Sequence, residues 1–212
     1  MIDMIFYDCS TAPSPRRARI LLAEKNAIFT TANIDISKAE QLGDAFKAIN
    51  PACTVPVLQL DDGTVITENA GIAAYLEAAY PSPPMFGSSA TENGLVAAWN
   101  AKIEFDGLQA IAEAMRNSSP MMKGRALTGA VNHDQIPELA ARGITRLNLF
   151  FDRLNERLEG REFVAIDSFS YTDITAVVAV DFARIVRVKA QQHHTNITRW
   201  RSALAERPSF SL

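Results

Sequence analysis

The chain has 212 residues, of which 48% are hydrophobic and 21% are charged, and its formal net charge is −3. Such a chain can bury a sizeable core as one large domain or two small ones, so wholesale disorder is not expected. The slight excess of acids argues against a nucleic-acid binder whose affinity rests on a broad basic surface. The sequence has no apolar run of membrane-spanning length and no secretory signal pattern, so neither membrane insertion nor secretion is expected.

The cysteine and histidine content predicts neither a disulfide framework nor a metal site. Two cysteines, Cys9 and Cys53, are too few for a framework or for a zinc site of the usual composition. The histidines, His133, His193 and His194, have no metal-ligand spacing with either cysteine. A reduced, cytoplasmic protein is therefore expected.

The first eighty residues alternate strand and helix signals. Apolar runs and alternating segments predict strands, and an Asp-Gly turn joins the last two of them as a hairpin. The predicted order is strand, helix, strand, helix, strand, strand, helix. The strands are expected at residues 4–7, 29–36, 57–60 and 64–67, and the helices at residues 15–25, 39–49 and 68–79.

The rest of the chain carries almost no strand signal. The proline-rich stretch at 81–87 is incompatible with a helix or an interior strand and predicts a linker over residues 81–90. Apolar residues at helical spacing then follow, which predicts an all-helical domain over residues 91–212. The fold class is therefore α+β, with a mixed domain over residues 1–80 ahead of the helical one. The helices are expected at 91–115, 137–158, 173–188 and 197–204.

A proline stands directly before the predicted strand at 57–60. Pro56 is compatible with the first residue of an edge strand, where a missing N–H is tolerated. Alternatively, the Val55–Pro56 bond is cis and exposes the Val55 backbone, so that its N–H and C=O pair with an extended, peptide-like ligand. From these residues alone, both interpretations stay open.

Glu68 and Asn69 open the predicted helix at 68–79. An acid is favoured at a helix N-terminus and Asn69 is a good N-cap, so capping by itself would explain both residues. A ligand would add a second role, because helix N-terminal amides hold a carboxylate and Glu68 would hold an ammonium group. Together they would grip the charged end of an amino-acid-like molecule.

Two further polar groupings are interpreted structurally. Ser170 and Asp173 precede an apolar run and predict a capping box at the start of a helix, with no catalytic role. Arg16, Arg17 and Arg19 form a basic run on the first predicted helix, which is typical of a solvated face. One of these arginines is also a candidate for holding an anionic ligand, and the sequence does not choose among them.

Taken in order, these segments resemble the cytosolic glutathione S-transferases along nearly the whole chain. The resemblance rests on Y-D-C-S-T-A-P-S-P-R-R-A-R-I-L-L-A-E-K near the start, N-P-A-C-T-V-P-V-L in the middle and D-G-T-V-I-T-E-N-A-G-I-A-A-Y-L after it. The later F-S-Y-T-D-I-T is similar to the capping box of that family's helical domain. The resemblance implies a thioredoxin-like N-terminal domain, an all-α C-terminal domain and a homodimer with its ligand cleft between the two domains.

The resemblance also implies where glutathione binds. Val55, beside cis-Pro56, would pair with the cysteinyl backbone, and Glu68 and Asn69 would hold the γ-glutamyl end. Gln41 is the weaker candidate for the glycine carboxylate. Where many members have serine after the acid, this chain has Asn69, which still donates a hydrogen bond.

The sequence leaves open which group stabilises the thiolate. Glutathione reacts as thiolate, and an ordinary thiol with a pKa near 8.5 is only about 3% ionised at pH 7. Alignment with the family places Ala12 where other classes have a serine or cysteine, and alanine donates no hydrogen bond. The segment is most similar to a fungal and bacterial subgroup lacking the usual residue. Thr11, Ser14 or a held water are the candidate donors, and a helix that starts near Pro13 would aim its N-terminal dipole at the sulfur. Other neighbours able to donate are Ser10, Cys9 and Tyr7.

Three functions are compatible with this resemblance. The first is an enzyme of detoxification that conjugates glutathione to a small hydrophobic electrophile bound by the helical domain. The second is a glutathione-dependent thiol-transferase or peroxidase, which Ala12 disfavours because that chemistry needs a cysteine at its position. The third is a non-catalytic glutathione-binding or regulatory module, which Ala12 favours. Whether Cys9 or Cys53 is reactive stays open.

Overall fold

The structure, a computed structural model, describes residues 4–212. Internal contacts divide the chain into two compact units. The first unit holds the residues up to Pro83 together with Thr128–Val131 and Leu212, and the second unit holds Pro84–Leu127 and Asn132–Ser211. The predicted linker over residues 81–90 therefore contains the boundary between the units.

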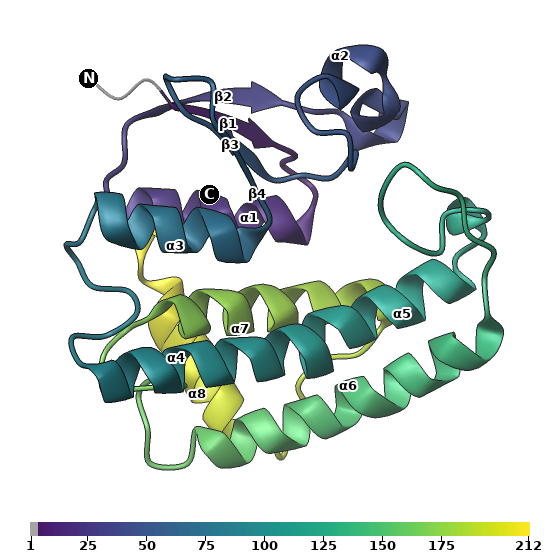
Figure 1. Cartoon of the computed structure of the whole chain (residues 1–212). Helices are drawn as coiled ribbons and strands as arrows, with labels where there is room; N and C mark the ends of the chain where they lie inside the picture. Colours follow the sequence, from purple (N-terminus) through teal and green to yellow (C-terminus); the bar gives the residue numbers. More distant parts are fainter. Residues whose placement is uncertain (1–3) are drawn as a thin grey trace. The chain divides into compact units, whose positions relative to one another are not determined.

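The first unit is a four-stranded mixed sheet with helices on it, which is the predicted thioredoxin-like arrangement. The strand order is β2-β1-β3-β4, in which β1 is parallel to β2 and antiparallel to β3, and β3 is antiparallel to β4. Helices α1 and α3 lie side by side along one face of the sheet (Figure 1). The elements are β1 (Met4–Asp8), α1 (Pro13–Glu24), β2 (Phe29–Asn33), α2 (Asp44–Lys47), β3 (Val57–Gln59), β4 (Val65–Thr67) and α3 (Asn69–Ala79).

Alternation along β1 gives the sheet two different faces, because successive side chains of a strand point to opposite sides. Phe6 is fully buried and its ring meets Phe29 of β2 edge-on at 5.9 Å between centroids. Tyr7 points to the other side, where its ring lies 6.0 Å from Phe46 of α2. The short helix α2 is thus attached to the face opposite α1.

The predicted helix at 39–49 is wrong over most of its length. The segment forms two 3₁₀ turns, Ile36–Lys38 and Glu40–Leu42, before the single α-helical turn of α2. Ala39 adopts a left-handed conformation with φ of 58°, and Gly43 is extended, so the helix is interrupted at both residues. The predicted strand at 29–36 likewise ends early, because Asp35 caps the first turn through Ser37 N–H.

Lys25 ties the end of α1 to the chain that leaves the first unit. Its ammonium group is fully buried and donates to the backbone oxygens of Tyr80 at 2.8 Å and Pro83 at 2.7 Å. It also pairs with Glu77 Oε2 at 2.5 Å. A buried lysine is tolerated only with such partners, so this contact fixes the path of residues 80–83.

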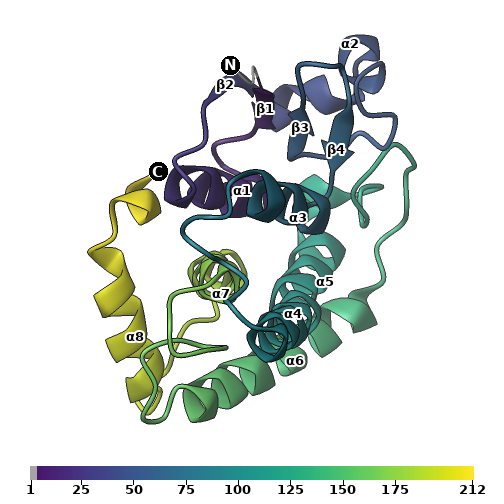
Figure 2. The ribbon, with the colours of Figure 1, turned by 60° about the vertical axis from the view of Figure 1, so that its left-hand side comes forward.

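The second unit is all-helical, as predicted, and α7 lies at its centre (Figure 2). Every residue from Tyr171 to Val180 is buried, in accord with the nearly unbroken apolar run there. The helix predicted at 91–115 is interrupted by a π-helical turn, and the one predicted at 173–188 gives way to a 3₁₀ turn after Phe182. The elements are α4 (Ala90–Ile103), the π turn η3 (Glu104–Leu108), α5 (Gln109–Ser118), α6 (Pro137–Arg157), α7 (Tyr171–Phe182), η5 (Ala183–Val186) and α8 (Thr195–Ala205).

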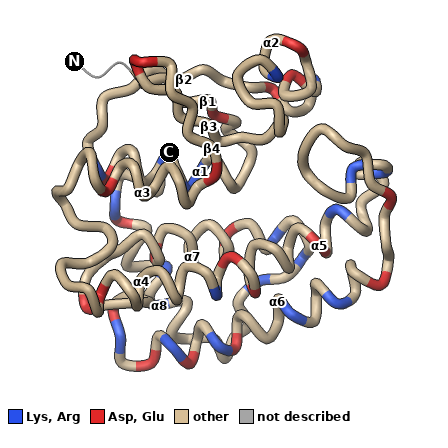
Figure 3. The backbone as a smooth tube through the Cα atoms, in the orientation of Figure 1, with Lys and Arg blue, Asp and Glu red and all other residues tan. Residues whose placement is uncertain are grey.

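Helices α5 and α6 approach closely because of a glycine. A Cβ atom on Gly143 of α6 would lie 2.7 Å from Ala110 O and 2.8 Å from Ala114 N, both on α5. Ion pairs add to this contact, since Arg142 and Arg146 of α6 both reach Glu113 of α5. Figure 3 shows basic residues spaced along α6.

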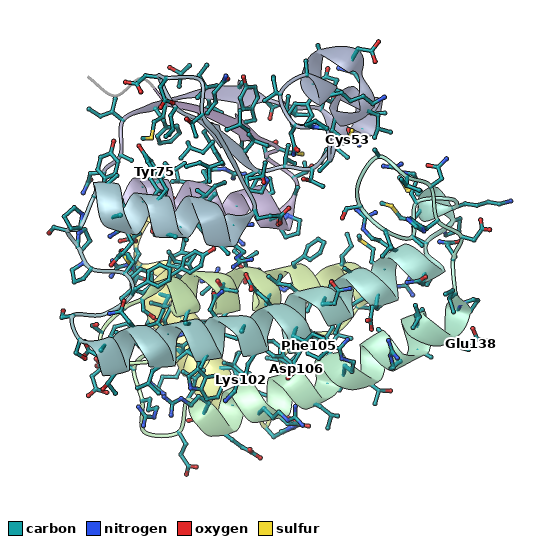
Figure 4. The ribbon with its side chains drawn as sticks, in the orientation of Figure 1. Cys53, Tyr75, Lys102, Phe105, Asp106 and Glu138 are labelled. Atoms are coloured by element: carbon teal, nitrogen blue, oxygen red, sulfur yellow. The ribbon has the colours of Figure 1, made fainter. Side chains whose placement is uncertain are left out.

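The π turn η3 also faces α6. Asp106 pairs with Arg153 at 3.3 Å and with Arg146 at 3.7 Å. Arg146 also lies over the ring of Phe105, 4.3 Å from its centroid. Figure 4 labels Phe105 and Asp106 on this turn. Because most of these charges are partly open to water, each pair contributes little by itself to stability.

Asp173 is the fully buried acid of the predicted capping box, which the structure confirms at the start of α7. Its Oδ1 accepts hydrogen bonds from the Val164 N–H at 2.9 Å and the Trp200 Nε1–H at 3.1 Å. Its Oδ2 accepts from the N–H and hydroxyl of Ser170 at 3.1 and 3.0 Å. One carboxylate therefore joins the chain before α7, the start of α7 and α8.

No helix within residues 4–212 combines the length and the apolar character needed to cross a membrane.

Candidate active site

The loop between β1 and α1 is held by an ion pair that the sequence did not suggest. Asp8, at the end of β1, is buried and receives two hydrogen bonds from the Arg19 guanidinium, at 2.9 and 3.1 Å. Arg19 also donates to Cys9 O at 3.4 Å. Arg19 and the buried Arg17 are therefore not part of a solvated face, which corrects the interpretation of the basic run.

The start of α1 offers one backbone amide and one hydroxyl. Ala12 is the N-cap and supplies no side-chain cap. Pro13 and Pro15 have no N–H, and Arg16 N–H is bonded to Ala12 O at 3.4 Å. Ser14 is therefore the residue of this turn whose N–H is left for a ligand. Its side-chain hydroxyl is a second polar group at the start of α1. The anion site predicted at this helix N-terminus therefore has fewer free backbone N–H donors than a first turn without prolines would have.

Ser14 is joined to the start of α3. The Asn69 side-chain amide donates to Ser14 Oγ at 3.0 Å, and Asn69 is buried. The N-termini of two helices that are 55 residues apart in sequence thus meet through a single hydrogen bond. Because Ser14 Oγ accepts this bond, its own proton can be directed to another acceptor.

Glu68, and not Asn69, is the N-cap of α3, so the prediction that Asn69 caps this helix is wrong. Glu68 has φ of 61° and ψ of 141°, a conformation that non-glycine residues rarely adopt. Its side chain is exposed, and within residues 4–212 its carboxylate has no hydrogen-bond or ionic partner. Such backbone strain is often kept at ligand sites.

The loop before β3 presents the Val55 backbone. The Val55–Pro56 bond is cis, as predicted. Asn50 organises the loop, since its amide donates to Thr54 O at 2.8 Å while its Oδ1 accepts from Ala52 N–H at 3.1 Å. Neither the N–H nor the C=O of Val55 is hydrogen-bonded to any other residue in the described part of the chain. The backbone edge expected to meet a peptide-like ligand is therefore open.

The remaining candidates have different environments. Gln41 lies in the 3₁₀ turn Glu40–Leu42, and its buried Oε1 has no hydrogen-bond partner among the described residues. Thr11 is exposed, and its hydroxyl lies 3.5 Å from the Cys9 sulfur. The Tyr7 hydroxyl already donates its proton within the sheet, to Gln59 Oε1 at 2.9 Å.

Both cysteines are buried as free thiols. Cys53, labelled in Figure 4, adopts a left-handed backbone with φ of 58°, and its thiol points to Pro51 O at 3.6 Å. Glycine adopts a positive φ more readily than cysteine does. Cys9 lies at the end of β1 beside Thr11.

Sequence reasoning missed three contacts that shape this site: Asp8 with Arg19, Asn50 with its loop, and Asn69 with Ser14. Asn50 carried a local signal, since an asparagine before a proline favours a turn. The other two join residues distant in sequence and had no local signal.

Comparison with known proteins agrees with this fold. Residues 11–79 match the sequence profile of the glutathione S-transferase N-terminal domain, and residues 119–208 match that of the C-terminal domain. Glutathione S-transferase 2 of Saccharomyces cerevisiae is 32% identical over 208 residues, which cover 97% of this chain and 87% of the yeast protein.

Solved structures give the same result. The crystal structure of yeast Gtt2 has a TM-score of 0.88 at 31% identity and covers 98% of both chains. A glutathione S-transferase domain-containing protein of Marinobacter aquaeolei has a TM-score of 0.87 at 32% identity, covering 97% of this chain and 98% of the other.

The thioredoxin-like unit followed by an all-helical unit and the matches to both family domains together place the chain in a class of glutathione-dependent transferases. The chain belongs to the glutathione S-transferase family.

Proposed function

We propose that this protein conjugates the thiolate of glutathione, its co-substrate, to small hydrophobic electrophiles, and that the start of α1 stabilises the thiolate. The observation that carries the proposal is the hydrogen bond from Asn69 to Ser14 Oγ. It places a hydroxyl donor beside the Ser14 amide at a helix N-terminus, where an anion is favoured.

The energetic requirement is modest. Lowering the thiol pKa by about two units takes roughly 2.7 kcal/mol of anion stabilisation. One backbone amide, one hydroxyl and a helix N-terminus are together of sufficient strength, because a hydrogen bond to a charged group contributes about 1.5–3 kcal/mol. Ser14 is then the donor to sulfur, and Asn69 is a positioning residue that orients the Ser14 hydroxyl. Thr11 is a secondary donor candidate, and Ala12 contributes only its backbone.

The rest of glutathione would be held by open polar groups in the same unit. The Val55 backbone, beside Pro56, is free to pair with the cysteinyl residue. Glu68 would bind the γ-glutamyl ammonium, for which its exposed carboxylate is suited. Gln41 would reach the glycine carboxylate through its amide, one polar atom of which is unpaired in the described structure.

The test combines turnover with spectroscopy. Ser14→Ala should lower kcat/KM toward a chromogenic electrophile by about 10–100-fold, less than the 10²–10³-fold typical of a sole donor because the Ser14 amide remains. The absorbance of bound thiolate, titrated against pH, should show a raised thiol pKa in this variant. Tyr7→Phe and Cys9→Ala are the matched controls and should stay within a few-fold of wild type. A large loss in either control, with Ser14→Ala unaffected, would assign the thiolate to a conventional side chain instead.

A non-catalytic glutathione-binding module is the second candidate, since Ala12 supplies no side-chain donor at the N-cap. It predicts glutathione binding by calorimetry without turnover of any electrophile tested. The thiol-transferase alternative has less support, because both cysteines are buried.

Membership of this family also motivates expectations for the oligomeric state, the location and the role of the enzyme. We expect a homodimer that acts in the cytoplasm in detoxification. Size-exclusion chromatography with light scattering tests the homodimer.

A further inference from the structure

A second polar cluster lies in the helical unit and includes none of the residues assigned to glutathione. It is formed by Asp152 of α6 together with His193 and His194, which directly precede α8. Helix α8 packs against α6, which brings these residues together across 41 positions of sequence (Figure 2). Sequence reasoning considered the histidines only against the cysteines and therefore missed Asp152.

The two imidazoles converge on one carboxylate oxygen. Asp152 Oδ1 lies 2.9 Å from His194 Nε2 and 3.6 Å from His193 Nε2. The three ligand atoms all lie within 4.8 Å of one another, and the two imidazole rings have their centroids 4.1 Å apart. Ligands bound to one ion at about 2.0–2.1 Å are separated by distances of this order.

The cluster has a fixed part and an open part. His194 is buried, its ring stacks on Phe151 at 5.9 Å, and its Nδ1 accepts the Gln191 N–H at 3.0 Å. His193 and Asp152 are exposed, with 69% and 52% of their side chains accessible. A rigid ligand beside two accessible ones gives an ion both a defined position and a path from solvent.

We propose that Asp152, His193 and His194 bind one divalent transition-metal ion, such as Zn²⁺ or Co²⁺, with water completing its coordination. Two imidazoles and one carboxylate suit these ions, whereas Mg²⁺ and Ca²⁺ prefer oxygen ligands. The proposal is independent of glutathione binding, because it uses none of the residues assigned to that site.

Binding has a structural cost at His194. With Nδ1 accepting from Gln191, the neutral ring carries its proton on Nε2 and donates it to Asp152. An ion at Nε2 displaces that proton, so the ring proton moves to Nδ1 and Gln191 N–H loses its acceptor. The site should therefore bind less tightly than a preformed three-ligand site.

The experiment uses untagged full-length protein without glutathione, titrated with Co²⁺ by calorimetry and by visible absorbance. Wild type should bind one ion per chain with a visible spectrum of nitrogen and oxygen coordination, and excess Mg²⁺ should not compete. His193→Ala and Asp152→Asn should each weaken binding at least about ten-fold, since loss of a mere outer partner already costs 10–100-fold. Both substitutions are at exposed positions, and circular dichroism checks their folding.

His133→Ala is the matched control, because His133 is exposed and lies outside the cluster. It should bind Co²⁺ as wild type does. A wild-type dissociation constant weaker than about 1 mM, or unchanged affinity in either cluster variant, would overturn the proposal.

Discussion

Replacing Asp173 by asparagine should destabilise the helical unit strongly while hardly changing its shape. The side chain keeps its size, but it exchanges one acceptor oxygen for an amide group that only donates. Asp173 is fully buried and its two oxygens accept four hydrogen bonds, from Val164, Trp200 and both polar groups of Ser170. In either orientation of the new side-chain amide, its NH2 group faces two of these four donors, which then lose their acceptor.

The size of the effect follows from those contacts. A hydrogen bond to a charged group contributes about 1.5–3 kcal/mol, and Asp173→Asn loses two of the four such bonds. We therefore expect Asp173→Asn to lower the free energy of unfolding by about 3–5 kcal/mol. For a chain of this length, that corresponds to a fall in Tm of about 6–20 °C.

Urea unfolding followed by circular dichroism, at about pH 7.5, measures this change. Asp167→Asn is the matched control, because the Asp167 side chain is fully exposed and its ion pair with Arg161 is long at 3.9 Å. The control should stay within about 0.5 kcal/mol of wild type. A loss below about 1 kcal/mol for Asp173→Asn would refute the view that this carboxylate holds three segments together.

The pH dependence gives a second measure of the same group. Burial raises the pKa of Asp173 from 3.8 to about 6, against the lowering effect of its hydrogen bonds to Val164, Trp200 and Ser170. Because the folded pKa lies above the unfolded one, the folded state binds the proton more tightly. The stabilisation that this tighter proton binding gives the folded state is complete below pH 3.8 and is lost as the pH rises through 6. Between about pH 7.5 and pH 5, wild type should gain roughly 1.4 kcal/mol relative to Asp173→Asn, which has no proton to bind. A gap that narrows on acidification would contradict the assigned direction.

Three further outcomes are expected. Glu68→Ala should weaken glutathione binding by about 1–3 kcal/mol in calorimetry, because the ligand's ammonium loses its partner, and unchanged affinity would remove Glu68 from the site. Gly143→Ala should lower the free energy of unfolding by at least about 1–3 kcal/mol, since the added Cβ would lie 2.7 Å from an α5 backbone atom. Gly94→Ala is the control: with open space around it, it should stabilise α4 by about 0.5–1 kcal/mol. Equal effects of the two substitutions would argue against close packing of α5 on α6. Lys25→Ala should cost about 2–4 kcal/mol in urea unfolding, because two backbone carbonyls lose a buried donor, and a neutral result would show that water replaces it.

The parts of the protein that could be predicted from sequence are those with a local physical cause. The Asp-Gly turn selects the hairpin of β3 and β4, and the buried apolar run selects α7. The capping box at Ser170 uses side chains three residues apart. The residues around Pro56 left its geometry open, and the family resemblance decided for the cis bond at Val55–Pro56. The resemblance to a family then supplied the fold and the candidate residues of the glutathione site.

Predictions from residue propensity were wrong at positions where the backbone conformation or the contacts differ from what the residue type favours. Ala39 turns left-handed and breaks the helix expected at 39–49, although alanine is the best helix former. Asn69 is a good N-cap by composition, yet Glu68 occupies that position and Asn69 donates to Ser14 instead. Propensity is a weak preference, and tertiary contacts override it.

Only the tertiary structure decided which distant polar groups meet. Asp8 and Arg19 close the loop before α1, Asn69 orients Ser14, and Asp152 meets the two histidines before α8. Hydrogen bonds and ion pairs act over a few ångströms, and sequence periodicity specifies the faces of helices and strands without specifying which faces come within that range. The sequence therefore determined the fold class and the family, while the packing of helix on helix and helix on sheet determined which polar groups meet in the candidate site.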